Sequence, residues 1–183
     1  MSTSRYLQYG DSAAWLITPG ANGAPAGSTS CYYRAVTTPS PVKIIMLTDS
    51  SRLLARIRQL IAIPSVSSVS PQFDQSNRAV IDLLATWLEE IGFAVRVEPL
   101  LERPDKANLI ATLGAGPGGL VLAGHTDTVP FDAGRWRYDP FGGTVANERI
   151  YGLGSADMKS FLALAIAAAR EFSARDLRQP LLI

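Results

Sequence analysis

The sequence of 183 residues contains a single histidine, His125, and a single cysteine, Cys31. One cysteine cannot form a disulfide within the chain, so the fold does not depend on such bonds, which is typical of a reducing compartment. We therefore expect a cytoplasmic protein. The single histidine also means that at most one imidazole is present for any metal site.

Neither sign of charge is in excess, and no long hydrophobic run is present. Seventeen basic and sixteen acidic residues leave a net charge of +1, without a basic block that could follow a phosphate backbone. The longest apolar stretch, FLALAIAAA at 161–169, is about half of the roughly 20 residues that cross a bilayer. These features argue against nucleic acid and against a membrane as partners.

The N-terminal segment, residues 1–45, has few charges and no hydrophobic period. It contains four charged residues among Gly, Pro, Ser, Thr and Ala, a composition that does not build a stable core. Its stretch AAWLI is too short for the apolar region of a signal peptide. We expect residues 1–45 to be a disordered extension or the product of a misassigned start, and the folded domain to occupy residues 46–183.

Apolar residues recur at helical spacing in three segments. The first begins at Asp49 and stops before Pro64, the second follows Asp74 and stops at Gly92, and the third starts near Asp157. The predicted apolar faces consist of Leu53, Ile57, Leu60 and Ile61, then Val80, Leu83, Leu84, Trp87, Leu88 and Ile91, and finally Phe161, Leu162, Ala165, Ala168, Ala169 and Phe172.

Strand-like segments lie between the second and third predicted helices. FAVRVEP at 93–99 alternates as a half-buried strand does, and NLIATLG follows from residue 108. LVLAG at 120–124 is apolar on both faces, as expected of a central strand covered on both sides. GTVANERIYG predicts a hairpin that turns at Asn147 and Glu148. This order predicts an α/β domain in which a mixed, mostly parallel sheet is layered between helices.

The last residues of the chain, QPLLI at 179–183, have the character of another buried strand. A domain does not normally stop at the opening of such a strand. We therefore expect the domain to be incomplete at its C-terminus.

The motif GHTDTVP at 124–130 follows the predicted strand LVLAG directly. α/β folds place their ligands at the carboxyl ends of strands, and residues i and i+2 of an extended chain face the same way. Either His125 and Asp127 both bind a metal, or the imidazole binds it while the carboxylate holds the other ring N–H. We favour the second arrangement; the alternative to both is a polar loop after a strand.

A second motif, YGLGSADMKSF at 151–161, places Asp157 at the start of the third predicted helix, where the helix dipole favours a carboxylate. The alternative is that Asp157 or Ser155 only caps this helix. The glycines at 152 and 154 are not a dinucleotide-binding motif, because Asp157 replaces the third glycine and would repel a pyrophosphate. Ser155 lacks the surroundings of a nucleophilic serine. Lys159 either tunes the charge of the site or is a solvated surface lysine.

Taken together, GHTDTVP and GLGSADMK resemble the zinc aminoacylase and carboxypeptidase family of metallohydrolases over about residues 50–183. The resemblance implies a zinc-peptidase-like fold, of which residues 46–183 are the N-terminal part of the catalytic domain, truncated. It implies that His125 binds one metal ion and that Asp127 orients His125. It also implies that Asp157 bridges two metal ions.

The longer string HTDTVPFDAGRW, followed by DPF and YGLGSADMKSF, narrows what the resemblance implies. The implied substrate is a small N-acyl amino acid, N-acetylornithine, which is hydrolysed to ornithine and acetate in arginine biosynthesis. The implied enzyme is a cytoplasmic homodimer with two Zn²⁺ ions, or Co²⁺, per full-length subunit. A succinyl-diaminopimelate desuccinylase or a dipeptidase of the same family is the alternative. Arg135, Trp136, Asp139 and Phe141 are expected to pack within their loop, and Ser160 replaces a glycine that many relatives have.

One part of the implied machinery is missing from this sequence. The family takes its general base from an adjacent glutamate pair, and none follows Asp157 here. His125 and Asp157 provide two direct ligands, whereas a stable zinc site uses three or four. We expect the 183-residue chain to bind metal weakly and not to turn over substrate. Two alternatives to a hydrolase are a non-catalytic α/β interaction module and a fragment that does not fold.

Overall fold

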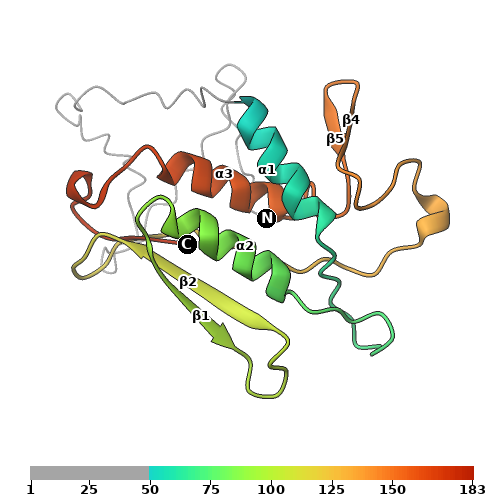
Figure 1. Cartoon of the computed structure of the whole chain (residues 1–183), viewed down its shortest axis with the longest axis horizontal. Coiled ribbons are helices and arrows are strands. Elements are labelled where there is room, and N and C mark those ends of the chain that lie inside the picture. The colour runs from blue at the N-terminus through green and yellow to red at the C-terminus, as the bar shows by residue number, and fades with distance from the viewer. Residues whose placement is uncertain (1–49) are drawn as a thin grey trace, which may run out of the picture. The chain divides into compact units, whose positions relative to one another are not determined.

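The structure is a computed structural model that describes residues 50–183 (Figure 1). The expected extension, residues 1–45, and the expected domain start at Met46 lie outside the described residues. The described part contains α1 (Ser50–Ala62), α2 (Arg78–Glu89) and α3 (Lys159–Ala169), with the short 3₁₀ helices η1 (Ala133–Arg135) and η2 (Ala174–Asp176). None of the helices in this part is both long enough and apolar enough to cross a membrane.

The main sheet has the strand order β1-β2-β6-β3. Its strands are β1 (Ala94–Pro99), β2 (Ala107–Leu113), β3 (Leu120–Val121) and β6 (Leu181–Leu182). β2 is antiparallel to β1 and to β6, and β3 is parallel to β6. The mixed sheet of an α/β domain is therefore confirmed. The expectation of a mostly parallel sheet is wrong for the described residues, because β3–β6 is parallel whereas β1–β2 and β2–β6 are antiparallel.

The position of LVLAG within the sheet differs from the prediction. In the described part it is an edge strand, because β3 pairs only with β6. Leu120 and Val121 are 59% and 61% exposed. The C-terminal segment forms β6 and takes the inner place between β2 and β3. An apolar pattern indicates a tendency to be buried, but it cannot determine which strand gains neighbours along both edges.

α1 and α2 bury the faces that their spacing predicts. α2 packs against β1 and β2, and α1 packs against α3 (Figure 1). Arg56 of α1 is buried as well, although the pattern did not indicate it: its guanidinium lies 4.7 Å from the ring centroid of Trp87 and 3.6 Å from a carboxylate oxygen of Glu90. The shared core includes Ile57, Leu60, Ile61, Val80, Leu84, Trp87, Leu88, Leu162, Ala163 and Ile166.

The predicted hairpin is confirmed as β4 (Thr144–Ala146) and β5 (Arg149–Tyr151), an antiparallel pair. Asn147 and Glu148 form its turn with φ values of 50° and 60°. Two successive positive φ values match the right-handed twist of the flanking strands and are typical of a type I′ turn. β5 leads directly into the second sequence motif.

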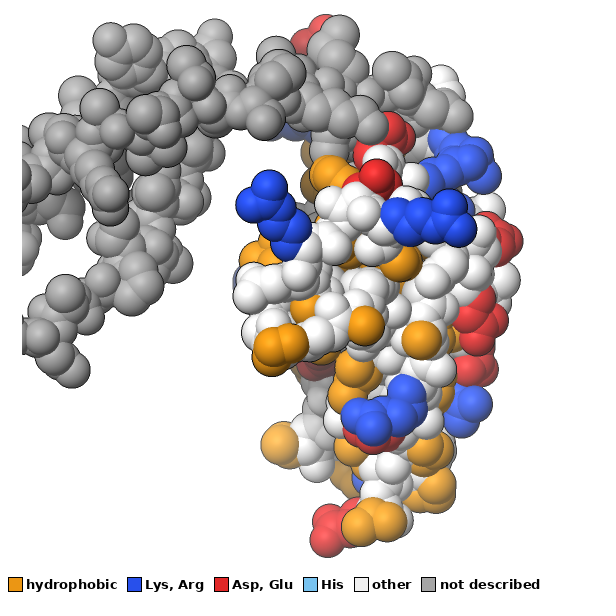
Figure 2. Space-filling model, turned by 90° about the vertical axis from the view of Figure 1, so that its left-hand side faces the viewer, with side chains coloured by type: hydrophobic (Ala, Val, Ile, Leu, Met, Phe, Trp, Pro, Cys, Tyr) orange, Lys and Arg blue, Asp and Glu red, His pale blue; other side chains and the backbone are white. Residues whose placement is uncertain are grey.

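The face of the molecule seen in Figure 2 carries basic and acidic side chains interspersed with hydrophobic ones. The Lys and Arg side chains on this face do not merge into one continuous patch. This view agrees with the nearly balanced charge of the sequence.

Candidate metal centre

The first motif forms a loop beyond the carboxyl end of β3, as the sequence predicts. Gly124 allows α3 to approach this loop closely, because a Cβ atom there would lie 2.8 Å from Cδ2 of Leu162. His125 and Asp127 follow, and their side chains are 46% and 49% exposed. Both side chains are therefore accessible to a ligand.

Residues 65–67 hold this loop from one side through main-chain hydrogen bonds. The N–H of Thr128 donates to the carbonyl of Ser65 at 3.0 Å, and the N–H of Ser67 donates to the carbonyl of Thr128 at 2.8 Å. The Oγ of Ser65 donates to the carbonyl of Thr126 at 2.7 Å. Ser65 and Thr128 are buried, so these bonds are shielded from competing water.

Asn77, just before α2, holds the same loop from the other side. Its Nδ2 donates to Oγ1 of Thr126 at 3.0 Å and to the carbonyl of Ala107 at 2.9 Å. Its Oδ1 accepts from the N–H of Ala107 at 2.9 Å. Asn77 thus links Thr126 to Ala107 of β2, and the side chains of His125 and Asp127 are not used in this link. Ser65 and Asn77 carry no local sequence signal, since their partners lie far away along the chain.

The second motif forms a turn that ends before α3, and here the predicted helix start is wrong. α3 begins at Lys159, with Met158 at the N-cap position and no side-chain capping bond. Asp157 therefore lies two residues outside the helix, and neither Asp157 nor Ser155 caps it. Gly154 has a φ of 83°, which favours glycine, and it lies in the turn that leads to α3.

The structure brings together the three residues that the sequence analysis singled out. Nε2 of His125 lies 2.9 Å from Oδ1 of Asp157. On the other side of the ring, Nδ1 lies 3.1 Å from the carbonyl oxygen and 3.2 Å from Oδ1 of Asp127. The carboxylate of Asp157 is 83% exposed. One imidazole therefore stands between two carboxylates, and both of its nitrogens face oxygen acceptors.

This arrangement needs an additional positive charge, because a neutral imidazole carries only one N–H. Desolvation of the ring lowers the pKa of His125, but the hydrogen bonds and negative charges of Asp157 and Asp127 outweigh it and raise the pKa. A divalent cation on Nε2 would satisfy the same need, leaving Nδ1–H to donate to Asp127. Two ligands of one tetrahedral zinc ion lie roughly 3.3 Å apart, close to the observed separation of Nε2 and Oδ1. The donor set therefore fits zinc.

Within residues 50–183, no group of three or more His, Cys, Asp or Glu side chains is arranged to hold a metal ion. The cluster at His125 thus offers fewer direct ligands than a structural zinc site uses. A cavity of about 300 Å³ opens beside it, lined by His125, Asp127, Trp136 and residues 152–157. The ligand pair therefore lies at the wall of a space that can hold a small molecule.

The aromatic residues of the HTDTVPFDAGRW and DPF strings pack with one another, as expected. Phe131 makes edge-to-face contacts with Trp136, at 6.3 Å between ring centroids, and with Phe141 at 5.4 Å. Oδ1 of Asp139 accepts from the N–H of Phe141 at 2.9 Å. Nε of Arg135 lies 3.6 Å from a carboxylate oxygen of Asp132. Trp136 also lines the cavity.

Lys159 is not a solvated surface lysine, which corrects one of the two expectations for it. The residue is 1% exposed. Its Nζ donates to the carbonyl of Leu60 at 3.0 Å and to the carbonyl of Ile63 at 2.6 Å. Burial lowers the pKa of Lys159 to about 8. The helical pattern gave no sign of this, because the two carbonyls belong to the end of α1.

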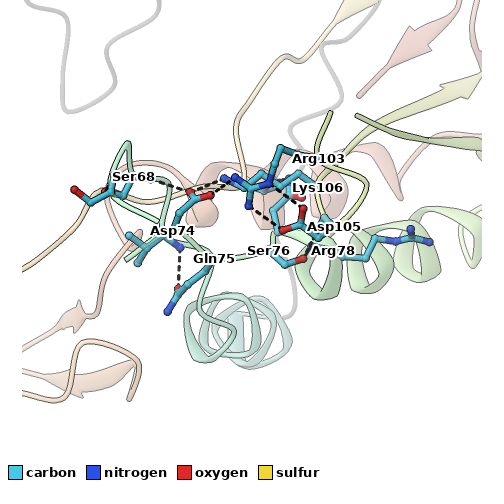
Figure 3. A network of polar contacts seen from close by, with 12 residues as sticks. Ser68, Asp74, Gln75, Ser76, Arg78, Arg103, Asp105 and Lys106 are labelled. Carbon is cyan, nitrogen blue, oxygen red and sulfur yellow. Dashed lines mark hydrogen bonds and ion pairs between the residues drawn. The ribbon is translucent and has the colours of Figure 1, made fainter. Parts of the chain in front are cut away.

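A polar network around Asp74 supports the segment that holds the site loop (Figure 3). Oδ1 of Asp74 accepts from Nζ of Lys106 at 2.6 Å and from the N–H of Ser68 at 2.9 Å, and Oδ2 lies 2.7 Å from a guanidinium nitrogen of Arg103. Arg103 also binds both carboxylate oxygens of Asp105. The bonds from Lys106, Ser68 and Arg103 hold the pKa of Asp74 well below its usual range.

Comparison with known proteins gives this site a family context. Residues 121–183 match the sequence model of Peptidase family M20/M25/M40. The acetylornithine deacetylase of Proteus mirabilis is 55% identical over 126 residues, which make up 69% of this chain and 33% of that protein. The chain thus spans about a third of the length of the curated relatives it matches.

Solved structures share the fold at low sequence identity. Human carnosine dipeptidase 1 superposes with a TM-score of 0.61 at 23% identity, covering 73% of this chain and 31% of that one. An M20 family metallo-carboxypeptidase from Sulfolobus solfataricus superposes with a TM-score of 0.56 at 20% identity, covering 71% of this chain and 29% of that one. Residues 121–183 are thus similar in sequence to peptidase family M20/M25/M40, and the described part shares its fold with solved structures that include an M20 family metallo-carboxypeptidase.

Proposed function

We propose that the whole protein is a metal-dependent amide hydrolase that converts N-acetylornithine to ornithine and acetate. In this proposal His125 and Asp157 are metal ligands, and Asp127 orients the imidazole. The observation that carries it is the ring of His125, which has a carboxylate oxygen 2.9 Å from Nε2 and another 3.2 Å from Nδ1. The choice of substrate is supported by the similarity to curated acetylornithine deacetylases.

The chain's own residues would hold and orient the cation. A divalent cation, when bound, supplies a Lewis acid for the amide carbonyl. The carbonyl oxygen and Oδ1 of Asp127 would accept a hydrogen bond from Nδ1–H, which fixes the tautomer that leaves the lone pair of Nε2 free. Asp157 presents an exposed carboxylate beside that lone pair. Trp136 gives the neighbouring cavity an aromatic wall next to the acidic groups.

The remaining details of the proposal follow the resemblance to the family. The whole protein would bind two Zn²⁺ ions per subunit, or Co²⁺, and would act as a cytoplasmic homodimer in arginine biosynthesis. Two direct ligands are fewer than a stable zinc site uses. We therefore expect the 183-residue chain by itself to bind Zn²⁺ weakly and to leave N-acetylornithine unhydrolysed.

Metal binding can be tested at one residue, because the chain has only one histidine. In protein labelled with ¹⁵N-histidine, titration with Zn²⁺ is expected to shift the Nε2 resonance while Nδ1 stays protonated. His125→Ala removes the signal, and Asp157→Asn weakens the Zn²⁺ dependence because it removes the second ligand. Asp127→Asn is expected to lower the Zn²⁺ affinity about 10–100-fold, because it loosens the orientation of the ring.

The control for these variants is Glu102→Gln, which removes an exposed carboxylate outside the cluster. Its Zn²⁺ affinity should equal that of the unchanged chain. Imidazole resonances that do not respond to millimolar Zn²⁺ would contradict the proposed metal centre. The substrate is tested with the whole protein, for which a higher kcat/KM on N-succinyl-diaminopimelate than on N-acetylornithine would reject the substrate but keep the hydrolase class.

A further inference from the structure

Lys159 occupies an unusual place for a lysine, at the junction of two helices. It is the first residue of α3, and its ammonium lies between the carbonyl of Leu60 in the last turn of α1 and that of Ile63 just after α1. Carbonyls at the end of a helix have no next turn to bind them, and Pro64 has no N–H to offer; the carbonyl of Leu60 also accepts a long bond from the N–H of Ile63, at 3.3 Å. The charge also complements the negative end of the α1 dipole. Lys159 thus joins the start of α3 to the end of α1.

The aliphatic part of Lys159 contacts the turn that carries Asp157. A Cβ atom at Gly154 would lie 3.0 Å from Cδ of Lys159 and 3.0 Å from Cγ2 of Thr128. The N–H of Lys159 also donates to the carbonyl of Gly154 at 2.9 Å. Gly154 is therefore enclosed between the Lys159 stem and Thr128, a residue of the loop that carries His125.

Three segments consequently meet around this one side chain: the end of α1, the turn before α3 and the loop after β3. The turn before α3 carries Asp157, and the loop after β3 carries His125. Within the described residues, the ammonium of Lys159 binds the carbonyls of Leu60 and Ile63, and it forms no bond with Nε2 of His125 or the carboxylate of Asp157. Any effect on the pair must therefore act through the backbone positions that Lys159 fixes.

We propose that Lys159 is a positioning residue that holds Asp157 within reach of His125 by fastening the start of α3 to the end of α1. This inference rests on the proposed function, in which His125 and Asp157 bind a common metal ion. It predicts that the relative position of His125 and Asp157 depends on the ammonium of Lys159 more than on the overall stability of the domain.

The experiment replaces the ammonium with an apolar group of similar length, Lys159→Met, in the whole 183-residue chain. The Zn²⁺ affinity is read from the imidazole resonances of His125. We expect Lys159→Met to lower the affinity about tenfold or more, within the range typical of residues that orient metal ligands. Lys159→Arg keeps a cation for the two carbonyls and is expected to retain more of the affinity.

The matched control is Arg56→Met, which removes the other buried cation of residues 50–183, located in α1. Arg56 contacts Trp87 and Glu90 of the α2 region. This variant is expected to lower the free energy of unfolding but to leave the Zn²⁺ affinity at His125 unchanged. A loss of affinity in Lys159→Met without a loss in Arg56→Met separates positioning from general destabilisation.

The outcomes distinguish the two proposals. If the unchanged chain shows no response of His125 to Zn²⁺, the proposed function fails, and the role of Lys159 fails with it. If the unchanged chain binds Zn²⁺ and a folded Lys159→Met binds it equally well, only the role of Lys159 is overturned. Should near-UV circular dichroism show that Lys159→Met is unfolded, Lys159→Gln decides, because it keeps a hydrogen-bond donor for the carbonyls and removes the charge. A folded Lys159→Gln with unchanged affinity overturns the role of Lys159, and one with weakened affinity supports it.

Discussion

At the scale of single residues, the buried hydroxyl groups of the described part differ in whether they have a hydrogen-bond partner. The Oγ of Ser65 is buried and donates to the carbonyl of Thr126. The Oγ of Ser160 is buried too, but it has no hydrogen-bond partner within residues 50–183. A buried hydroxyl without a partner loses its bonds to water and gains none in return. These two serines should therefore respond in opposite ways to removal of the hydroxyl.

Ser160→Ala is expected to raise the free energy of unfolding by about 1 kcal/mol, because it removes an unpaired hydroxyl and adds the residue with the highest helix propensity. Ser65→Ala is expected to lower it by about 1 kcal/mol, because the carbonyl of Thr126 loses its donor. Urea unfolding followed by far-UV circular dichroism measures both. A destabilised Ser160→Ala variant would show that its hydroxyl does have a partner.

The central residues of the candidate site could be predicted from the sequence, but the residues that hold their loops in place could not. The resemblance of the two motifs to a metallohydrolase family predicted His125 and Asp157 as metal ligands, and the structure brings their side chains together. Ser65, Asn77 and Lys159 carry no such local signal. Each acts on a segment far away in the sequence, so its role depends on the packing of the whole domain.

At the scale of elements, the predictions succeeded where one periodic pattern extends over several turns. α1 and α2 have such patterns, and both bury the predicted faces. The start of α3 was predicted two residues too early, because an acidic residue before an apolar run also occurs in non-helical turns. β3 was predicted to be inner rather than edge, because strand order depends on pairing partners and not on the strand's own composition.

The hairpin β4–β5 offers a test of element stability close to the site. Glu148 has a φ of 60°, a conformation that costs a residue with a Cβ atom about 1 kcal/mol relative to glycine. Glu148→Gly should therefore slow amide hydrogen exchange in β4 and β5. Asn147→Gly is the matched control, and it should gain less because asparagine tolerates positive φ. Equal or faster exchange in Glu148→Gly would contradict a type I′ turn at these residues.

At the scale of the whole molecule, the site depends on segments joined across the fold. Residues 65–67 bind the loop after β3, and the same segment continues to Ser68, which donates to Asp74. Asp74 in turn pairs with Arg103 and Lys106 of the β1–β2 connection (Figure 3). Asp74 thus binds two cations of the β1–β2 connection. The loop that carries His125 is attached to the segment that leads to Asp74.

This network predicts how the stability of the domain depends on acid. The ammonium of Lys106, the N–H of Ser68 and the guanidinium of Arg103 lower the pKa of Asp74 below the ordinary value of 3.8. A carboxylate whose pKa is lower in the folded state stabilises the fold above its unfolded pKa, and this stabilisation is lost as the pH falls below that value. Asp74→Asn should therefore be less stable than the unchanged chain at neutral pH, and its stability should fall less between about pH 6 and about pH 3.

Urea unfolding at the two pH values measures this difference, with Asp105→Asn as the control. The pKa of Asp105 is also lowered by Arg103, but its side chain is 46% exposed whereas that of Asp74 is 4% exposed. Solvent weakens exposed ion pairs, so Asp105→Asn should remove less of the acid dependence than Asp74→Asn does. If Asp74→Asn and the unchanged chain lose stability equally on acidification, the contacts of Asp74 with Lys106 and Arg103 do not persist in solution. The support for the loop of His125 would then come from the bonds of Ser65, Ser67 and Asn77.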